Sequence, residues 1–462
     1  MVFSSLLFLF FYLPATLLVY YLVPSRYRSL WLFAVNLVFY GWGEPVFVLL
    51  MVFSIAVNYA AGLLVEKHRD RAVPILTLNA VVNLGLLFFF KYYDFLAGSL
   101  SRIPGLGFLH PLGVTLPIGI SFYTFQNMSY PIDVYRGDAK PQRSFIRYGT
   151  YVALFPQLIA GPIVRYKDIA DQLDDRRETA ERFASGVTRF CVGLAKKVLL
   201  ANSIGALWDV YKSMSPASLS LADAWLGAVA FTFQIYFDFS GYSDMAIGLG
   251  RMLGFEFMEN FNYPYISKSI TEFWRRWHIS LSTWFRDYVY IPLGGNRRGR
   301  GRQLLNLLIV WALTGFWHGA SWNFLLWGLY YAALLILEKL FLYDRLEKAP
   351  GWVGHVYALF FVVIGWVLFS VEDLGSCAAY IRSMFFGGSG IVSGTFLYYL
   401  RSYALSLAVM VFAATPLPKK LFSRLPEGLL RVVRPILVLL SLVLCTAYLV
   451  DSTYNPFLYF RF

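Results

Sequence analysis

Long apolar runs recur from one end of the chain to the other, and they constrain its fold more than any other feature. Most are long enough to cross a hydrocarbon core of about 30 Å. They cover roughly 4–23, 29–43, 45–65, 74–97, 116–134, 146–164, 221–250, 304–340, 351–371, 402–415 and 428–450. Because unpaired backbone polar groups are costly in lipid, such segments form helices. The sequence predicts an all-α integral membrane protein. About ten or eleven transmembrane helices would form a single membrane domain, 1–462.

Two of these runs fit a crossing less well. The run 29–43 is short, and the run 146–164 contains Pro156, Gly161 and Pro162, which interrupt a helix. Non-helical backbone at membrane depth has to be buried in protein, so either run is a candidate re-entrant segment. Two more polar stretches, 165–200 and about 256–303, have the pattern of amphipathic helices that lie on the membrane.

Composition and charge agree with a membrane protein. Hydrophobic residues make up 58% of the chain and charged residues only 15%, which excludes a set of soluble domains. The net charge of +13 is explained by basic loops that orient spans toward an anionic cytoplasmic leaflet, so no nucleic acid is implied. Basic clusters place three loops in the cytoplasm and the N-terminus outside: Arg26/Arg28, Lys67/Arg69/Arg71 and Arg136/Lys140/Arg143. The three scattered cysteines predict neither a disulfide framework nor a metal site.

His318 is the first candidate catalytic residue. It lies in Trp317-His318-Gly319, inside an apolar run from Leu307 to Leu337 that would be roughly 45 Å long as one helix. This length predicts a break, and Gly315 and Gly319 flank the histidine. At 1.5 Å per residue His318 would lie about 17 Å deep, where an ionisable group suggests function. The alternative is a histidine that only hydrogen-bonds across two helices.

His278 is the second candidate. Ser269 and Glu272 form a plausible capping box that starts an amphipathic helix, with His278 at the border of its two faces. The alternative is an incidental histidine on an interfacial helix. Downstream, Gly294-Gly-Asn296 and Arg297, Arg298 begin a glycine- and arginine-rich run. This run fits either a phosphate site or a positive-inside loop, since no Walker pattern is present.

Two carboxylates lie in an apolar setting within 221–250. The segment reads Asp238-Phe-Ser240-Gly-Tyr242-Ser-Asp244. Paired acids can serve as general acid and base, but a structural role is the favoured interpretation. In that interpretation they hold a helix break together, through hydrogen bonds to the region of Arg275 and Arg276.

Several of these motifs, in this order, resemble the membrane-bound O-acyltransferase (MBOAT) family, in its branch of alginate and related polysaccharide O-acetyltransferases. The resemblance covers most of positions 1–345 and returns at the C-terminus. It rests on 116–126, 130–137, 237–248, 272–282, Trp317-His318-Gly319 and 455–462. The resemblance implies a ring of tilted helices around a tunnel that joins a cytoplasmic entrance to an extracellular funnel. It also implies that His318 is catalytic and that His278 is the second residue of the site.

The implied reaction is acyl transfer. A cytoplasmic thioester, acetyl-CoA, would donate an acetyl group for O-acetylation of an extracellular polysaccharide such as alginate. His318 would act as general base, while His278 would orient the thioester or polarise its carbonyl. Our own hypothesis adds Arg275, Arg276, Arg297 and Arg298 as groups that attract the donor phosphates. Asp238, Ser240, Tyr242, Asp244, Trp317 and Asn296 would support the site, and no bound cofactor or metal is expected.

The resemblance further implies a bacterial cytoplasmic membrane, contact with membrane lipid, and an extracytoplasmic partner of the SGNH-esterase type that completes transfer to the glycan. Three alternatives stay open. Two lie within the family: D-alanyl transfer to teichoic acid and O-acetylation of peptidoglycan. The third is a glycan or proton-coupled transporter, although the chain shows no paired halves.

Overall fold

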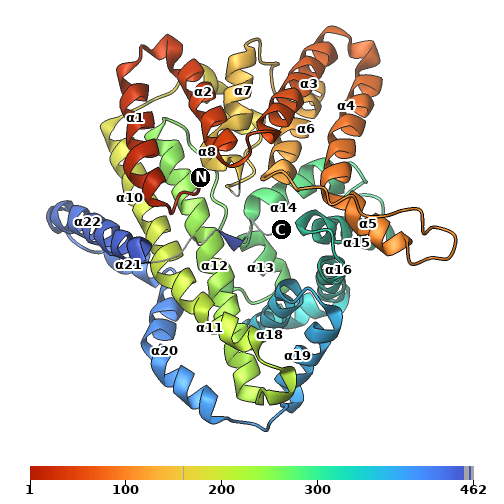
Figure 1. Ribbon diagram of the computed structural model, residues 1–462, viewed down its shortest axis with the longest axis vertical. Coiled ribbons are helices and arrows are strands. Elements are labelled where there is room, and N and C mark those ends of the chain that lie inside the picture. The colour runs from red at the N-terminus through yellow and green to blue at the C-terminus, as the bar shows by residue number, and fades with distance from the viewer. Residues whose placement is uncertain (160, 452–456, 459–462) are drawn as a thin grey trace. The chain divides into compact units, whose positions relative to one another are not determined.

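Helices are the only regular secondary structure among the residues described by this computed structural model, which are all except 160, 452–456 and 459–462 (Figure 1). Seven helical stretches have the length and hydropathy to cross a membrane: Phe47–Lys67, Arg69–Leu100, Ala180–Ser213, Trp322–Lys348, Gly351–Ser370, Gly394–Ala413 and Glu427–Asp451. A shorter apolar helix covers Phe8–Leu22. The predicted fold class is confirmed, whereas the number of crossings stays a prediction. The C-terminal motif 455–462 lies outside the described residues except for Phe457 and Leu458.

The chain divides into two compact units. Unit 1 comprises Met1–Cys191, Tyr242–Met258 and the described part of 449–461. Unit 2 comprises Val192–Gly241 and Glu259–Tyr448, and it contains both candidate catalytic histidines. The helices of unit 1 are α1 (Leu13–Leu22), α2 (Ser25–Gly43), α3 (Phe47–Lys67), α4 (Ala72–Leu87), α5 (Tyr93–Leu100), α6 (Ile120–Arg136), α7 (Phe145–Ala153), α8 (Phe155–Leu158), α9 (Tyr166–Asp174) and most of α10 (Ala180–Ala195).

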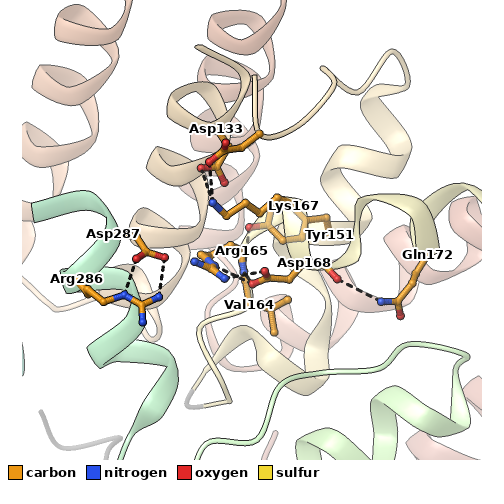
Figure 2. A network of polar contacts seen from close by, with 10 residues as sticks. Asp133, Tyr151, Val164, Arg165, Lys167, Asp168, Gln172, Arg286 and Asp287 are labelled. Atoms are coloured by element: carbon orange, nitrogen blue, oxygen red, sulfur yellow. Dashed lines mark hydrogen bonds and ion pairs between the residues drawn. The ribbon is translucent and has the colours of Figure 1, made fainter. Parts of the chain in front are cut away.

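Unit 1 has an unusually polar interior. Helices α3, α4 and α6 pack side by side (Figure 1), and α6 buries nearly its whole length, including Gln126, Asn127 and Asp133. The Asp133 carboxylate is fully buried and pairs with Lys167 Nζ at 3.5 Å, as Figure 2 shows. A second carboxylate, Asp138, binds the same ammonium at 2.9 Å. The buried charge of Asp133 is therefore neutralised by an ion pair, as burial requires.

The run 146–164 is broken, as its prolines and glycine predict. Helix α7 ends at Ala153, α8 covers only Phe155–Leu158, and residues 161–165 have no helical structure. The Tyr151 hydroxyl donates to the Val164 carbonyl at 3.0 Å (Figure 2), so polar backbone after the break is satisfied inside the protein. Whether the segment is re-entrant stays a prediction.

The segment 165–200 differs from the expected surface helix. Only α9 is a short, separate amphipathic helix. Beyond it, α10 continues through the π-helical turn η4 (Lys196–Ala201) into α11 (Asn202–Ser213), and this 34-residue stretch qualifies as a membrane span. Its charged residues Lys197 and Arg189 form ion pairs inside the protein, which lowers the cost of placing this stretch in a membrane.

Unit 2 is built around a helical hairpin. Its elements include α11, the first part of α12 (Leu221–Met252), α13 (Ile270–Arg276), α14 (Ile279–Phe285), α15 (Arg300–His318), α16 (Trp322–Leu337), α17 (Tyr343–Lys348), α18 (Gly351–Ser370), α19 (Leu374–Phe386), α20 (Gly394–Ala413), α21 (Leu417–Phe422) and most of α22 (Glu427–Asp451). The hairpin consists of α15 and α16, whose backbones touch at Gly315 and Gly328. Helices α20 and α22 are mostly exposed, as spans in contact with lipid would be.

Candidate functional site

His318 lies at the apex of the α15–α16 hairpin. It is the last residue of α15, and Gly319 then adopts an extended conformation before α16 begins at Trp322. The break that the length of the apolar run predicts is therefore confirmed. The imidazole is buried, and three aromatic rings meet it edge to face, with centroids 5.1 Å away for Trp317, 5.0 Å for Trp327 and 5.3 Å for Phe369.

The position of this apex depends on a residue that the sequence interpretation missed. Asn323 is fully buried and accepts a hydrogen bond from the Ser321 hydroxyl. Its amide nitrogen faces the carbonyl oxygens of Leu368 and Phe369, at 3.4 and 3.3 Å, at the end of α18. Asn323 therefore connects the start of α16 to the residue that forms one wall of the His318 environment.

His278 does not lie within a continuous amphipathic helix, and that prediction was wrong. Helix α13 ends at Arg276 and α14 begins at Ile279, with Trp277 and His278 in the turn between them. The φ angle of His278 is 46°, in the left-handed region that non-glycine residues seldom adopt. The predicted capping box is half formed: Ser269 Oγ accepts from the Glu272 amide at 3.0 Å, but the Glu272 carboxylate accepts from the Lys268 amide at 2.9 Å and not from that of Ser269.

Asn260 holds this unusual turn and sets the tautomer of His278. Its Oδ1 accepts hydrogen bonds from the Ser280 backbone amide at 3.2 Å and from the Ser280 hydroxyl at 2.9 Å, and it lies 3.2 Å from His278 Nδ1. Because a backbone N–H only donates, the Asn260 atom must be the oxygen. Nδ1 of His278 therefore carries the ring proton, and the lone pair lies on Nε2.

Burial also determines the charge of His278, which lies outside the seven candidate spans. Removal from water disfavours the imidazolium and lowers the pKa of His278 to about 3. The side chain is therefore neutral at physiological pH. In the unfolded chain this histidine has a pKa near 6.5 and binds a proton below that pH, whereas in the folded chain it stays neutral. His278 therefore destabilises the fold as pH falls below about 6.5.

We predict that His278 stays neutral down to pH 5. In a sample labelled with ¹⁵N-histidine, its signals, identified by their loss in His278→Asn, should keep a protonated Nδ1 and an unprotonated Nε2 from pH 8 to pH 5. A titration midpoint near 6.5 would contradict this prediction.

The two histidines share one aromatic cluster. The Trp317 ring lies 6.1 Å from the His278 ring and 5.1 Å from the His318 ring, centroid to centroid. Phe239 of α12 meets the His278 ring edge to face at 4.7 Å. The structure thus brings His318, His278 and Trp317 together within unit 2.

The four candidate arginines lie in different surroundings. Arg276 pairs with Glu272 at 2.9 Å, whereas Arg275, Arg297 and Arg298 are exposed. Asn296 is also exposed, in a loop where Gly294, Gly295 and Gly299 have positive φ. Buried Asn306, which the sequence interpretation missed, donates to the Gly295 carbonyl at 3.0 Å and so fixes the loop against α15.

The two carboxylates of 221–250 do not stabilise a helix break, because α12 is continuous from Leu221 to Met252. In unit 2, Asp238 pairs with Lys197 at 2.5 Å, and both side chains are 2% exposed. In unit 1, Asp244 pairs with Arg189 at 2.6 Å. The predicted link to Arg275 and Arg276 was wrong, since cations on α10 and η4 neutralise these acids.

The other two supporting residues are buried on α12. Ser240 is 1% exposed in unit 2. Tyr242 belongs to unit 1, where its ring stacks on Phe3 at 4.7 Å and meets Phe457 at 4.5 Å. The structure therefore gives Tyr242 a packing role in unit 1.

Residues 138–372 match the family described as MBOAT, membrane-bound O-acyltransferase. The "Probable alginate O-acetylase AlgI" of Azotobacter vinelandii is 47% identical over 85% of this chain and 80% of its own length. The protein of the same name from Pseudomonas putida is 42% identical over the full length of both chains. The "Peptidoglycan O-acetyltransferase" of Helicobacter pylori is 33% identical over 83% of this chain and 80% of its own.

Proposed function

The chain belongs to the membrane-bound O-acyltransferase family, and from this premise we propose that it moves an acetyl group from cytoplasmic acetyl-CoA across the membrane for O-acetylation of an extracellular polysaccharide such as alginate. It is a multi-pass membrane protein and an O-acetyltransferase. The observation that carries the proposal is the cluster of His318, Trp317 and His278, in which two buried imidazoles both lie next to one indole ring.

In the proposed chemistry His318 is the general base. It takes the proton of an acceptor hydroxyl as the alcohol oxygen attacks the thioester carbonyl, which forms an ester and breaks the C–S bond. The proton then passes to the departing thiolate, so the products are an O-acetyl ester and a free thiol. A neutral imidazole is the form that can accept such a proton.

For His278 the geometry favours one of its two proposed roles. Polarising a carbonyl from Nε2 would need an N–H there, whereas Nδ1 carries the proton and burial opposes a second one. Orienting the donor or accepting a hydrogen bond at Nε2 needs no further proton. We therefore propose that His278 orients the donor next to His318.

The remaining proposals concern the surroundings of the enzyme. We place it in the bacterial cytoplasmic membrane, with three basic loops on the cytoplasmic side, those of Arg26/Arg28, Lys67/Arg69/Arg71 and Arg136/Lys140/Arg143. Transfer to the glycan would be completed by an extracytoplasmic partner of the SGNH-esterase type.

The exposed arginines Arg297 and Arg298 are proposed to attract the donor phosphates. We predict that the double variant Arg297→Glu/Arg298→Glu raises the apparent KM for acetyl-CoA about tenfold, the cost of one or two charge-assisted hydrogen bonds, with little change in kcat. Steady-state kinetics with purified protein would measure both constants. The matched control is Arg424→Glu, another exposed arginine of unit 2. An unchanged KM would show that the two arginines do not bind the donor.

Comparison of donors tests the function itself. Purified protein in proteoliposomes would receive acetyl-CoA or a D-alanyl carrier-protein thioester, each with alginate or peptidoglycan fragments and a candidate partner. We expect consumption of acetyl-CoA with formation of ester on alginate. Preference for the D-alanyl thioester or for peptidoglycan would select the corresponding alternative, and transport without thioester cleavage would contradict an acyltransferase.

A further inference from the structure

One buried carboxylate is not used by the proposed chemistry. Glu338 is 1% exposed and belongs to η8 (Glu338–Leu342), a π-helical turn that directly follows α16. Its Oε1 accepts a hydrogen bond from the Ile270 amide at 2.6 Å. Its Oε2 accepts from the Thr271 amide at 2.8 Å and from the Thr271 hydroxyl at 2.6 Å. The acid therefore binds the first turn of α13, where backbone donors and the helix dipole favour negative charge.

These contacts complete the N-terminus of α13. Ser269 Oγ accepts from the Glu272 amide, and the Glu272 carboxylate accepts from the Lys268 amide at 2.9 Å. Every backbone N–H from Ile270 to Glu272 thus has a side-chain acceptor. A helix of seven residues has little stability of its own, so its position is set by such contacts and by packing.

Helix α13 is also packed against the hairpin that carries His318. The Trp274 ring lies 4.6 Å from the Trp311 ring of α15 and 4.9 Å from the Tyr331 ring of α16. The C-terminal end of α13 leads directly into the turn of His278. From Glu338, α16 leads back along the hairpin to His318. Helix α13, Glu338 and α16 therefore form a continuous chain of contacts between the two histidines.

We propose that Glu338 is a positioning residue for acyl transfer. Glu338 anchors the N-terminus of α13 to the base of the hairpin. Because α13 leads into the turn of His278, this anchor fixes the position of His278 relative to His318. The inference rests on the proposed function of the two histidines. A π-helical turn at this point is consistent with such a role, since these turns are frequent at functional sites.

The anchoring itself is tested without any reference to activity. Hydrogen exchange of the peptide that contains 269–276 would be measured in wild type, Glu338→Gln and Glu338→Ala. We expect the exchange of the Ile270 and Thr271 amides to rise about tenfold or more in Glu338→Ala, and less in Glu338→Gln, which keeps one acceptor oxygen. The control is Glu347→Gln, an exposed acid of α17, which should leave exchange unchanged. Unchanged exchange in Glu338→Ala would overturn the anchoring.

Kinetics then test positioning. We expect kcat to fall about tenfold or more in Glu338→Ala and less in Glu338→Gln, because misplaced groups lose much of their catalytic effect. The melting temperature of Glu338→Gln should stay near that of wild type. Thr271→Val removes the hydroxyl that donates to Glu338 and keeps the shape of the side chain, so it should lower kcat by a smaller factor. This variant replaces Glu338→Ala in the test if Glu338→Ala does not fold.

Faster exchange of the Ile270 and Thr271 amides in Glu338→Ala, together with an unchanged kcat, would overturn the positioning role. If the wild type showed no acyl transfer at all, the proposed function would fail while the exchange data would still decide whether Glu338 anchors α13.

Discussion

Replacement of His318 by alanine is expected to lower kcat for acetyl transfer by about a thousandfold, the usual contribution of a positioned general base. The substitution removes the only group at the hairpin apex that we assign to proton transfer. The rings of Trp317, Trp327 and Phe369, which contact it edge to face, have no basic nitrogen that can replace it. Donor KM should change little, because the acceptor proton is moved in the transition state. Single-turnover assays with purified protein in nanodiscs would measure the chemical step.

His110→Ala is the matched control for this experiment. His110 is exposed, and its ring nitrogen contacts the Phe108 carbonyl two residues away, so its loss should not alter turnover. If His318→Ala retained kcat within about threefold of wild type, well below any general-base effect, His318 would have no catalytic role.

Replacement of Gly328 by alanine is expected to have the largest effect on stability. A Cβ at this position would meet the carbonyl oxygen of Trp311 and would lie 3.0 Å from Gly315 Cα. These are backbone atoms, so α15 and α16 must separate to make room. Overpacking of this kind costs about 3 kcal/mol or more, and it would also displace His318. We predict a lower thermal midpoint in detergent and a fall in kcat together.

The control for Gly328→Ala is Gly301→Ala, on the same hairpin. A Cβ at Gly301 meets nothing within 4 Å. Because alanine favours a helix over glycine by up to about 1 kcal/mol, this variant should keep or slightly raise the thermal midpoint. Equal behaviour of the two variants would show that the close approach of α15 and α16 does not limit stability.

The break at His318 was predictable because its signal is local. An apolar run too long for one span, with glycine on both sides of an ionisable residue, predicts a hairpin with that residue at its apex. The apolar pattern likewise predicted the fold class. Both predictions depend on properties of contiguous sequence, namely length, hydropathy and helix-breaking residues.

The predictions that failed depended on partners far along the chain. The left-handed turn at His278 is held by Asn260, 18 residues upstream, in a segment with no pattern of its own. Asp238 and Asp244 are neutralised by Lys197 and Arg189, 41 and 55 residues away. Helical periodicity carries no information about such pairings, so the sequence placed a helix where a turn occurs and a break where α12 is continuous.

The proposed function requires one buried site that transfers acetyl from a thioester on one side of the membrane to an acceptor on the other. Its most direct measurement uses sealed proteoliposomes with ¹⁴C-acetyl-CoA confined to the side that the cytoplasmic loops face, and with alginate and the partner confined to the opposite side. We predict free thiol on the donor side and an equal amount of labelled ester on the acceptor side, both abolished in His318→Ala. The proposed function would be contradicted by thiol release without labelled ester across the membrane, or by transfer that persists in His318→Ala.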